Sequence, residues 1–263
     1  MPVRLLGCAL LVLGLGAVSP VLSQQEGASL ELQARGHWRT YGVTDGLGGL
    51  DVWSIFRDRD GDMWFATEGG GVSRFDGDTW TSFDVSDGLV DNSVYEIVQD
   101  VAGDLWFRSR RGVSRYDGRV LQQLSRKDGL LSDAVQDIVR DTQGNYWIAT
   151  DGGLTRYRTA RTLPTIRIKE VITDQSRGPA ETVSLSAREG YLHIAFQGGS
   201  FTTPADRLVY IYRLVGYEDQ WQTTRENRVE YSDLPVGEYR FQVKAVDLDL
   251  NYPASPAQAL VTS

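Results

Sequence analysis

Two acidic stretches of the chain carry oxygen ligands at a spacing that suits a hard cation. Residues 58–62 have the order Asp-x-Asp-Gly-Asp, with which a calcium loop begins, and residues 247–251 have the order Asp-x-Asp-x-Asn. The equivalents of the first stretch, at 100–104 and 141–145, lack its middle carboxylate. Since Asp and Gly also form tight turns for backbone reasons, we expect a hairpin turn and a solvated strand end here, and no metal site.

A basic cluster interrupts the acidic character of the chain, which has a net charge of −8. Arg108, Arg110 and Arg111 occur once, whereas the pattern around them occurs three times. Guanidinium groups bind carboxylates through paired hydrogen bonds. These three arginines are therefore our candidates for binding an acidic ligand, although a solvated basic face is the favoured interpretation, as it is for most charge runs.

General base catalysis would need a histidine or carboxylate within hydrogen-bond reach of a nucleophile. His193 lies in the β-rich run 191–196, on the face opposite Leu192 and Ile194, and His37 lies in a polar segment. Neither has an identifiable Ser or Cys partner in the sequence. Carboxylates are plentiful, so a glycosidase pair stays open, but no pair stands out. The sequence predicts no catalytic residue and no cofactor.

The elements that must position these side chains form a repeat of about 41 residues, which occurs three times. Each copy opens with Asp-Gly-Leu and continues with Val-x-x-Ile, an Asp, a Gly and a Trp. The opening aspartates are Asp45, Asp87 and Asp128, the glycines are Gly61, Gly103 and Gly144, and the tryptophans are Trp64, Trp106 and Trp147. A period near 40 with several short strands is typical of a β-propeller blade.

Alternation and turn residues place four strands in the first copy, at 52–57, 63–67, 72–75 and 80–83. The recurring tryptophans favour packing between neighbouring blades, because large rings dominate buried area; a sugar-stacking platform is the alternative. Arg74, Arg115 and Arg156 also recur, each beside an aromatic residue, and Asp76 and Asp117 lie near the first two. We expect an internal ion pair or a turn contact for these arginines.

Composition bounds the class of protein. Of 263 residues, 24% are charged and 41% hydrophobic, which is ordinary for a globular chain. The negative net charge argues against nucleic acid or an anionic membrane as the main partner. The apolar run 5–18 and Pro20 predict a signal peptide at 1–23, followed by a flexible lead-in at 24–36; an uncleaved membrane anchor is the alternative. We expect a periplasmic or secreted protein.

The repeat ends near Thr162-Leu163-Pro164, and β-rich segments of another kind follow. We therefore expect a partial β-propeller at 37–161 and a β-sandwich at 162–263. The sequence Leu234-Pro235-x-Gly237-x-Tyr239 suits the tyrosine corner of immunoglobulin-like sandwiches. The predicted fold class is all-β, with about three four-stranded blades followed by an immunoglobulin/fibronectin-III-like β-sandwich.

The repeat resembles the two-component regulator propeller repeat. Its pattern, Asp-Gly-Leu, Val-x-x-Ile-x-x-Asp-x-x-Gly-x-x-Trp, Thr-x-x-Gly and Arg-Tyr, is met at 87–116 and 128–157 with few gaps. The C-terminal part resembles the three-Y domain that follows these propellers. That match rests on Tyr210-x-Tyr212-Arg213-Leu214-x-Gly216-Tyr217-x-x-x-Trp221, on Tyr231 and on the segment from Leu234 to Tyr239, with a departure at 249–252.

The resemblance implies the periplasmic sensor half of a two-component sensor protein, in which a membrane helix and an output module such as a kinase normally follow. Nothing in this sequence resembles a kinase. Closed propellers have about four to eight blades, so three repeats leave two faces open, and a strand at 38–41 would pair with a last blade. A truncated product, a fragment that assembles with itself and a subunit that completes a partner are all compatible with this count.

We therefore expect an exported, non-enzymatic sensor or ligand-binding module of the two-component type. Its expected ligand is carbohydrate-like or acidic and small. We expect self-association or a partner chain at the open blade edges, no nucleic acid, and membrane contact only through a partner or an uncleaved signal. The alternatives are a structural protein-interaction module and a secreted propeller enzyme, either a lyase or a glycosidase.

Overall fold

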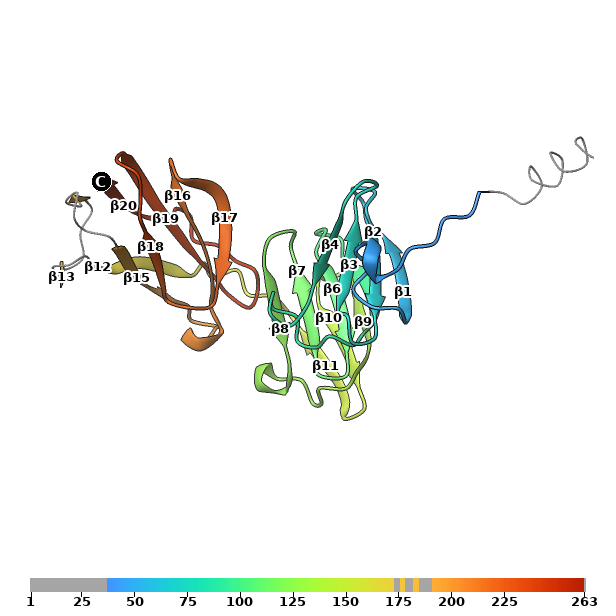
Figure 1. Cartoon of the computed structure of the whole chain (residues 1–263). Helices are drawn as coiled ribbons and strands as arrows, with labels where there is room; N and C mark the ends of the chain where they lie inside the picture. Colours follow the sequence, from blue (N-terminus) through green and yellow to red (C-terminus); the bar gives the residue numbers. More distant parts are fainter. Residues whose placement is uncertain (1–36, 173–175, 178–181, 185–190, 263) are drawn as a thin grey trace, which may run out of the picture. The chain divides into compact units, whose positions relative to one another are not determined.

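The chain is described here by a computed structural model that covers residues 37–172, 176–177, 182–184 and 191–262. Within these residues it consists of β-strands and three short 3₁₀ turns, η1 (Val43–Asp45), η2 (Arg126–Asp128) and η3 (Ala205–Arg207). The predicted all-β class is confirmed. In Figure 1 the blade strands run from blue to yellow-green and the sandwich strands from yellow to red. The predicted signal peptide and lead-in lie outside the described residues.

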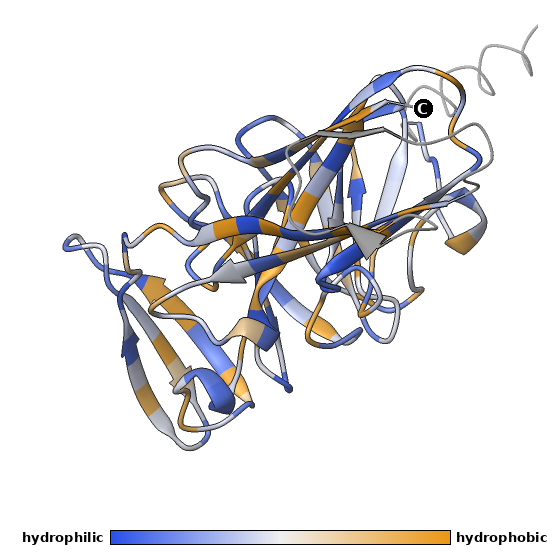
Figure 2. Cartoon of the chain, turned by 90° about the vertical axis from the view of Figure 1, so that its left-hand side faces the viewer, coloured by the Kyte–Doolittle hydropathy of each residue, from blue (hydrophilic) through white to orange (hydrophobic). Residues whose placement is uncertain are grey.

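The first repeat forms a four-stranded antiparallel sheet in chain order. Its strands are β1 (Val52–Arg57), β2 (Met63–Thr67), β3 (Val72–Phe75) and β4 (Trp80–Phe83). These bounds are the predicted ones, because each turn between the strands contains the glycine that ends one strand and starts the next. Hydrophobic and hydrophilic residues are interspersed along the strands (Figure 2).

The second repeat forms a four-stranded sheet of β5 (Val94–Gln99), β6 (Leu105–Ser109), β7 (Val113–Tyr116) and β8 (Leu121–Leu124). The third has three strands among the described residues, β9 (Val135–Arg140), β10 (Tyr146–Thr150) and β11 (Gly153–Tyr157). The expectation of four strands in every blade was therefore wrong for the third. Arg158-Thr159 stands where the other repeats have Asp-Gly, so the chain lacks the turn signal that would start a fourth strand.

The strand expected at 38–41 is also not formed, since residues 37–42 have no strand conformation. A strand exists through backbone pairing with a neighbour. The residues of this segment predicted a strand, but they do not tell whether a neighbouring strand is available for pairing.

The Asp-Gly-Leu motif forms the entry to each blade. Each aspartate accepts a hydrogen bond from the backbone N–H three residues earlier, at 2.8 to 2.9 Å. The following glycine adopts a positive φ between 111° and 119°, a conformation that L side chains rarely reach. The leucine then turns inward and is buried in all three copies. The motif is a structural turn.

The second aspartate of each repeat organises the hairpin between two strands. Asp58 Oδ1 accepts hydrogen bonds from the backbone of Asp60 and Asp62 at 3.0 and 2.9 Å. Its Oδ2 accepts one from the Trp64 indole at 2.7 Å. Asp100 with Trp106, and Asp141 with Trp147, repeat this arrangement. Stretch 58–62 is thus a turn in which both carboxylate oxygens of Asp58 accept hydrogen bonds from N–H donors.

The first two recurrent arginines form internal ion pairs, as expected. Arg74 pairs with Asp62 at 2.5 Å and Arg115 pairs with Asp104 at 2.5 Å, not with Asp76 or Asp117. Arg74 lies opposite Trp64 across the β2–β3 pair, so its side chain extends along the sheet to the preceding hairpin. In the third repeat Asn145 replaces the carboxylate.

The tryptophans of the first two repeats are buried between sheets. Trp64 lies 5.8 Å from Phe107 of the next sheet, and Trp106 lies 4.5 Å from Tyr146 of the next (ring centroids). Trp147, which ends the series, is only half-buried. The first two sheets therefore present their tryptophans to the sheet that follows in the chain.

The C-terminal part is a sandwich of two sheets. One has the order β13 (Ser176–Arg177), β12 (Thr165–Ile172), β15 (Tyr191–Gly199) and β18 (Arg228–Ser232). The other has the order β14 (Thr182–Ser184), β20 (Ala257–Thr262), β19 (Glu238–Val246), β16 (Val209–Val215) and β17 (Glu218–Thr224). Leu192, Phe196 and Phe241 are central to the core between them.

The predicted tyrosine corner is confirmed, because the Tyr239 hydroxyl donates to the Pro235 carbonyl at 2.7 Å. Tyr212 and Tyr231 pack against the same core. Burial raises the pKa of the Tyr231 hydroxyl. Among the residues that the structure describes, no helix is long and apolar enough to cross a membrane.

Candidate functional site

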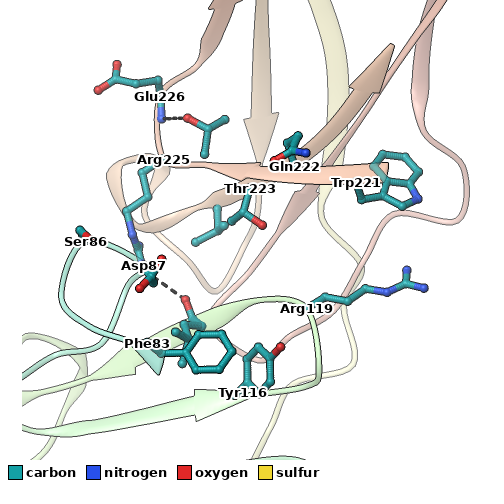
Figure 3. A pocket seen from close by; sticks show the side chains of 13 residues that line it. Phe83, Ser86, Asp87, Tyr116, Arg119, Trp221, Gln222, Thr223, Arg225 and Glu226 are labelled. Carbon is teal, nitrogen blue, oxygen red and sulfur yellow. Dashed lines mark hydrogen bonds between the residues drawn. The ribbon is translucent and has the colours of Figure 1, made fainter. Parts of the chain in front are cut away.

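A cleft of about 540 Å³ lies between the first two blades and the sandwich (Figure 3). We call it the junction cleft. Phe83, Ser86, Asp87, Tyr116, Arg119 and Leu121 line it from the blades, and Val209, Trp221, Gln222, Thr223, Thr224, Arg225 and Glu226 line it from the sandwich. A volume of a few hundred Å³ with aromatic walls and a few polar groups is usual for small-molecule sites.

The blade wall is formed by aromatic rings that blade packing holds in place. Phe83 ends β4 and Tyr116 ends β7, and their ring centroids lie 5.2 Å apart. Both rings also contact Trp64, at 5.8 and 5.9 Å. Arg119 stands at the tip of the β7–β8 hairpin, where it is exposed. The rings are therefore rigid, whereas the guanidinium is free to adjust.

The sandwich wall comes from β17 and the turn after it. Trp221 is half-buried, and the cations of Arg213 and Lys244 lie 4.6 and 5.6 Å from its ring centroid. Such cation–π contacts hold the indole in one orientation. Gln222, next to Trp221, adds an amide that can both donate and accept hydrogen bonds.

Arg225 reaches from the sandwich to the blade side, as Figure 3 shows. Its Nη2 donates to the Leu121 carbonyl at 3.2 Å. Loss of solvent around its guanidinium group, together with the charge of Arg207, lowers the pKa of Arg225. A guanidinium beside a second cation, with a neutral carbonyl as its hydrogen-bond partner, is a suitable group for a ligand carboxylate.

Buried hydrogen bonds fix the two walls relative to each other. Gln122 Nε2 donates to the carbonyls of Val246 and Asp247, at 3.1 and 2.9 Å. Arg207 Nη2 donates to the Gln123 carbonyl and to Asp128, both at 3.0 Å. These bonds join β8 and its following turn to the sandwich.

A second group of bonds involves the loop between β19 and β20. Asp249 accepts from the Tyr157 hydroxyl and from the Ala160 N–H. The Tyr252 hydroxyl donates to Asp117 at 2.5 Å. Burial, and then the neighbouring carboxylate, raises the pKa of both tyrosines. A small apolar cluster, Val120, Val209, Ile211 and Val246, fills the space beside these bonds.

Comparison with known protein families identifies the blade region and the sandwich. The model of the two component regulator propeller matches residues 46–69 and 129–152, and that of the Y_Y_Y domain matches residues 202–261. The chain carries two component regulator propeller repeats followed by a Y_Y_Y domain. The resemblance derived from the sequence is thereby confirmed.

Solved structures give distant likenesses. An extracellular domain of a hybrid two component system from B. thetaiotaomicron is 18% identical with a TM-score of 0.36, over 86% of this chain and 40% of that one. One of a one component system from the same organism is 17% identical with a TM-score of 0.38, over 85% and 37%. Virginiamycin B lyase from Staphylococcus aureus, in a catalytically inactive form, is 13% identical with a TM-score of 0.31, over 78% and 84%.

The chain thus spans about two fifths of the length of the two extracellular domains. A comparison with curated proteins gives no match.

The predicted arginine cluster lies in the second regulator propeller repeat, outside the lining of the junction cleft. Arg108 pairs with Glu96 at 2.9 Å, and it also donates to the Val135 carbonyl at 3.2 Å. Arg110 lies over the Tyr95 ring, and Arg111 is exposed. The structure gives Arg108 a role in joining two blades. Acidic-ligand binding by this cluster stays a prediction.

The remaining candidate residues have structural partners. His193 Nδ1 lies 3.6 Å from Glu230 on the neighbouring strand. Stretch 247–251 is a turn, in which Asp247 Oδ1 accepts from the backbone of Asp249 and Asn251. Of the Y_Y_Y motif, Trp221 lines the junction cleft and Tyr239 forms the corner.

Sequence reasoning missed most of the junction cleft. Arg119 and Arg225 belong to no motif, and more than a hundred positions separate them along the chain. One available signal was the likeness of stretch 247–251 to the blade hairpin at 141–145. Both have Asp first and Asn last, and both form the same turn. That likeness could have suggested that the β19–β20 loop forms a blade-like turn.

Proposed function

We propose that this chain is a non-enzymatic, exported sensor module of the two-component type, and that its ligand binds in the junction cleft. The observation that supports the proposal is that the blades and the Y_Y_Y sandwich each form one wall of the same cleft. A ligand that contacts both walls stabilises one arrangement of the two parts over others, which is how binding is passed on.

The chemistry of the walls supports an acidic, carbohydrate-like ligand. Trp221, Tyr116 and Phe83 offer aromatic surface to the apolar faces of sugar rings. Gln222 and the neighbouring threonines offer hydrogen bonds for hydroxyl groups. Arg119 and Arg225 supply two guanidinium groups for a carboxylate. A sugar acid, such as a uronic acid in an oligosaccharide, combines all three requirements.

Arg225 is the residue through which binding would reach the rest of the module. Its bond to the Leu121 carbonyl joins sandwich to blade. A ligand carboxylate forms a charge-assisted bond, which is stronger than a bond to a neutral carbonyl. Binding would therefore replace the hydrogen bond between Arg225 and the Leu121 carbonyl by one between Arg225 and the ligand. It would thereby change the contact between β8 and the turn after β17.

Export is part of the proposal and rests on the N-terminal sequence. The apolar run 5–18, followed by Pro20, supports a cleaved signal peptide. N-terminal sequencing of the protein produced in a bacterial host tests this. We expect the mature chain to begin at Gln24 and to be found outside the cytoplasm; an intact N-terminus in the cytoplasm would contradict export.

A glycan array with the purified mature chain tests ligand class and enzyme status together. We expect binding to uronic-acid glycans, weaker binding to neutral ones, and unchanged glycans by mass spectrometry after incubation. Turnover of a bound glycan would contradict the non-enzymatic proposal and favour a secreted lyase or glycosidase. Absence of binding to any acidic glycan would contradict the ligand class.

Matched variants locate the site. Trp221→Ala is compared with Trp53→Ala, an exposed tryptophan of β1 that does not line the cleft. Arg119→Ala is compared with Arg111→Ala, an exposed arginine of the predicted cluster. We expect about a tenfold or greater loss of affinity from Trp221→Ala and Arg119→Ala, and little change from the controls. A loss confined to Arg111→Ala would place the ligand at the arginine cluster instead.

A further inference from the structure

The same repeat positions differ sharply in exposure between the first blade and the other two. Val52 is 39% exposed, whereas its equivalents Val94 and Val135 are 1% and 3% exposed. Ile55 is 63% exposed, whereas Ile97 and Ile138 are 3% and 9% exposed. The residue types are unchanged in all three copies. This face of the first blade therefore carries the same apolar residues that the second and third blades bury against the blade before them. We call the Val52–Ile55 side of the first blade the entry face.

The third blade shows the opposite pattern on its other side. Leu154 is 56% exposed, whereas its equivalents Val72 and Val113 are fully buried. Trp147 is half-buried, whereas Trp64 and Trp106 are buried. We call the Trp147–Leu154 side of the third blade the exit face.

The two internal blade contacts show what covers such faces. In one, Trp64 and Val72 of the first blade pack with Val94 and Ile97 of the second. In the other, the equivalent residues are Trp106 and Val113 of the second blade, and Val135 and Ile138 of the third. In both cases an exit face packs on the entry face of the following blade. An exposed entry face thus fits an exit face of the same repeat, and this chain carries one of each.

We propose that a second copy of this chain covers these faces, with the exit face of each copy packed on the entry face of the other. Two copies together supply about six blades, within the range of roughly four to eight that closed propellers have, whereas one copy or three copies fall outside it. Each contact between copies pairs an exit face with an entry face, which are two different surfaces. Contacts of this kind give a closed assembly only when the rotation from one copy to the next completes a ring. Two copies meet that condition, and neither apolar face then stays exposed to solvent.

Mass measurement in solution tests this proposal with the purified mature chain. Light scattering coupled to size exclusion is expected to give twice the chain mass at micromolar concentration. Ile55→Arg places a charge on the entry face and is expected to give the mass of one copy. Because Ile55 is already largely exposed within one copy, the circular dichroism spectrum of the Ile55→Arg variant should match that of the wild type. Val236→Arg, at an exposed apolar position of the sandwich, is the matched control and should keep the doubled mass.

Mixing two variants tests the pairing of faces. Ile55→Arg keeps an intact exit face, and Leu154→Arg keeps an intact entry face. Each alone should give the mass of one copy, whereas the mixture should recover complexes of doubled mass through the one intact contact. A wild-type monomer, an open series of larger assemblies, or a mixture that stays monomeric would each overturn the proposal. A monomer would be the result if another segment of the chain covered the entry face.

Discussion

Tyr157 at the end of the last blade strand donates its hydroxyl hydrogen to Asp249 in the β19–β20 loop of the sandwich. The same carboxylate accepts the Ala160 N–H at 3.1 Å. One side chain of the sandwich is thus tied both to the blade and to the segment that connects the two parts. This makes Asp249 a central residue in the coupling between regulator propeller repeats and the Y_Y_Y domain.

Tyr157→Phe should therefore lower the free energy of unfolding by about 1–3 kcal/mol, because it removes one donor from a half-buried carboxylate. Calorimetry of the wild type should show one cooperative transition for blades and sandwich. A double-mutant cycle with Asp249→Asn should give a coupling energy, since the two side chains are in contact. Tyr217→Phe, an exposed tyrosine, is the control; an effect of Tyr157→Phe no larger than that of the control would contradict the coupling.

The blade tryptophans should differ in their effect on stability. Trp106→Ala leaves a cavity between the second and third blades and should cost roughly 3–5 kcal/mol. Trp147→Ala affects a half-buried ring and should cost about 1 kcal/mol. Urea unfolding measures both, in the Ile55→Arg background so that no second copy covers Trp147. Equal losses would show that Trp147 is packed as tightly as Trp106 within one chain.

Asp100 makes the stability of the blades sensitive to acid. Burial opposes its charged form, but hydrogen bonds from Tyr146 (2.5 Å) and Trp106 (3.1 Å) outweigh burial, and the pKa of Asp100 is lowered. Since the folded pKa lies below the unfolded value of about 3.9, the unfolded chain takes up the proton first as pH falls. The stabilisation is present above about pH 4 and is lost below it.

Urea unfolding at a series of pH values measures this effect. Asp100→Asn should be less stable than the wild type at neutral pH and should lose less stability on acidification. Asp206→Asn, an exposed aspartate in η3, is the control and should follow the wild-type profile. If Asp100→Asn and the wild type lose stability in parallel, another carboxylate is responsible for the acid sensitivity.

The local structure of the blades could be predicted closely from sequence. Strand bounds in the first repeat followed from glycine turns, and the corner at Tyr239 followed from Pro235 and Gly237. These features depend on residues close together in the chain. Their backbone preferences determine the turn without contacts from distant segments. The ion pair of Arg74 was expected, but its partner Asp62 could not be named from the sequence, because Asp76 is nearer in sequence, whereas Asp62 is nearer along the folded strand pair.

The junction could not be predicted in the same way. Phe83, Tyr116 and Trp221 each have an adequate role as packing residues of their own sheets, and nothing in the sequence says that they line one cleft. The fourth strand of the third blade was assigned from the repeat period, although Arg158-Thr159 lacks the turn chemistry of Asp76-Gly77. For this strand, the residues of the preceding turn were better predictors than the repeat length.

Hydrogen–deuterium exchange with a bound acidic glycan tests the central claim, that ligand binds between blade and sandwich. The probe is the uronic-acid oligosaccharide that binds most strongly on the array. We predict slower exchange in both β17 (Glu218–Thr224) and β8 (Leu121–Leu124), and its loss in the Trp221→Ala variant. Protection confined to the hairpin at 108–112, or protection of one wall without the other, would contradict the account.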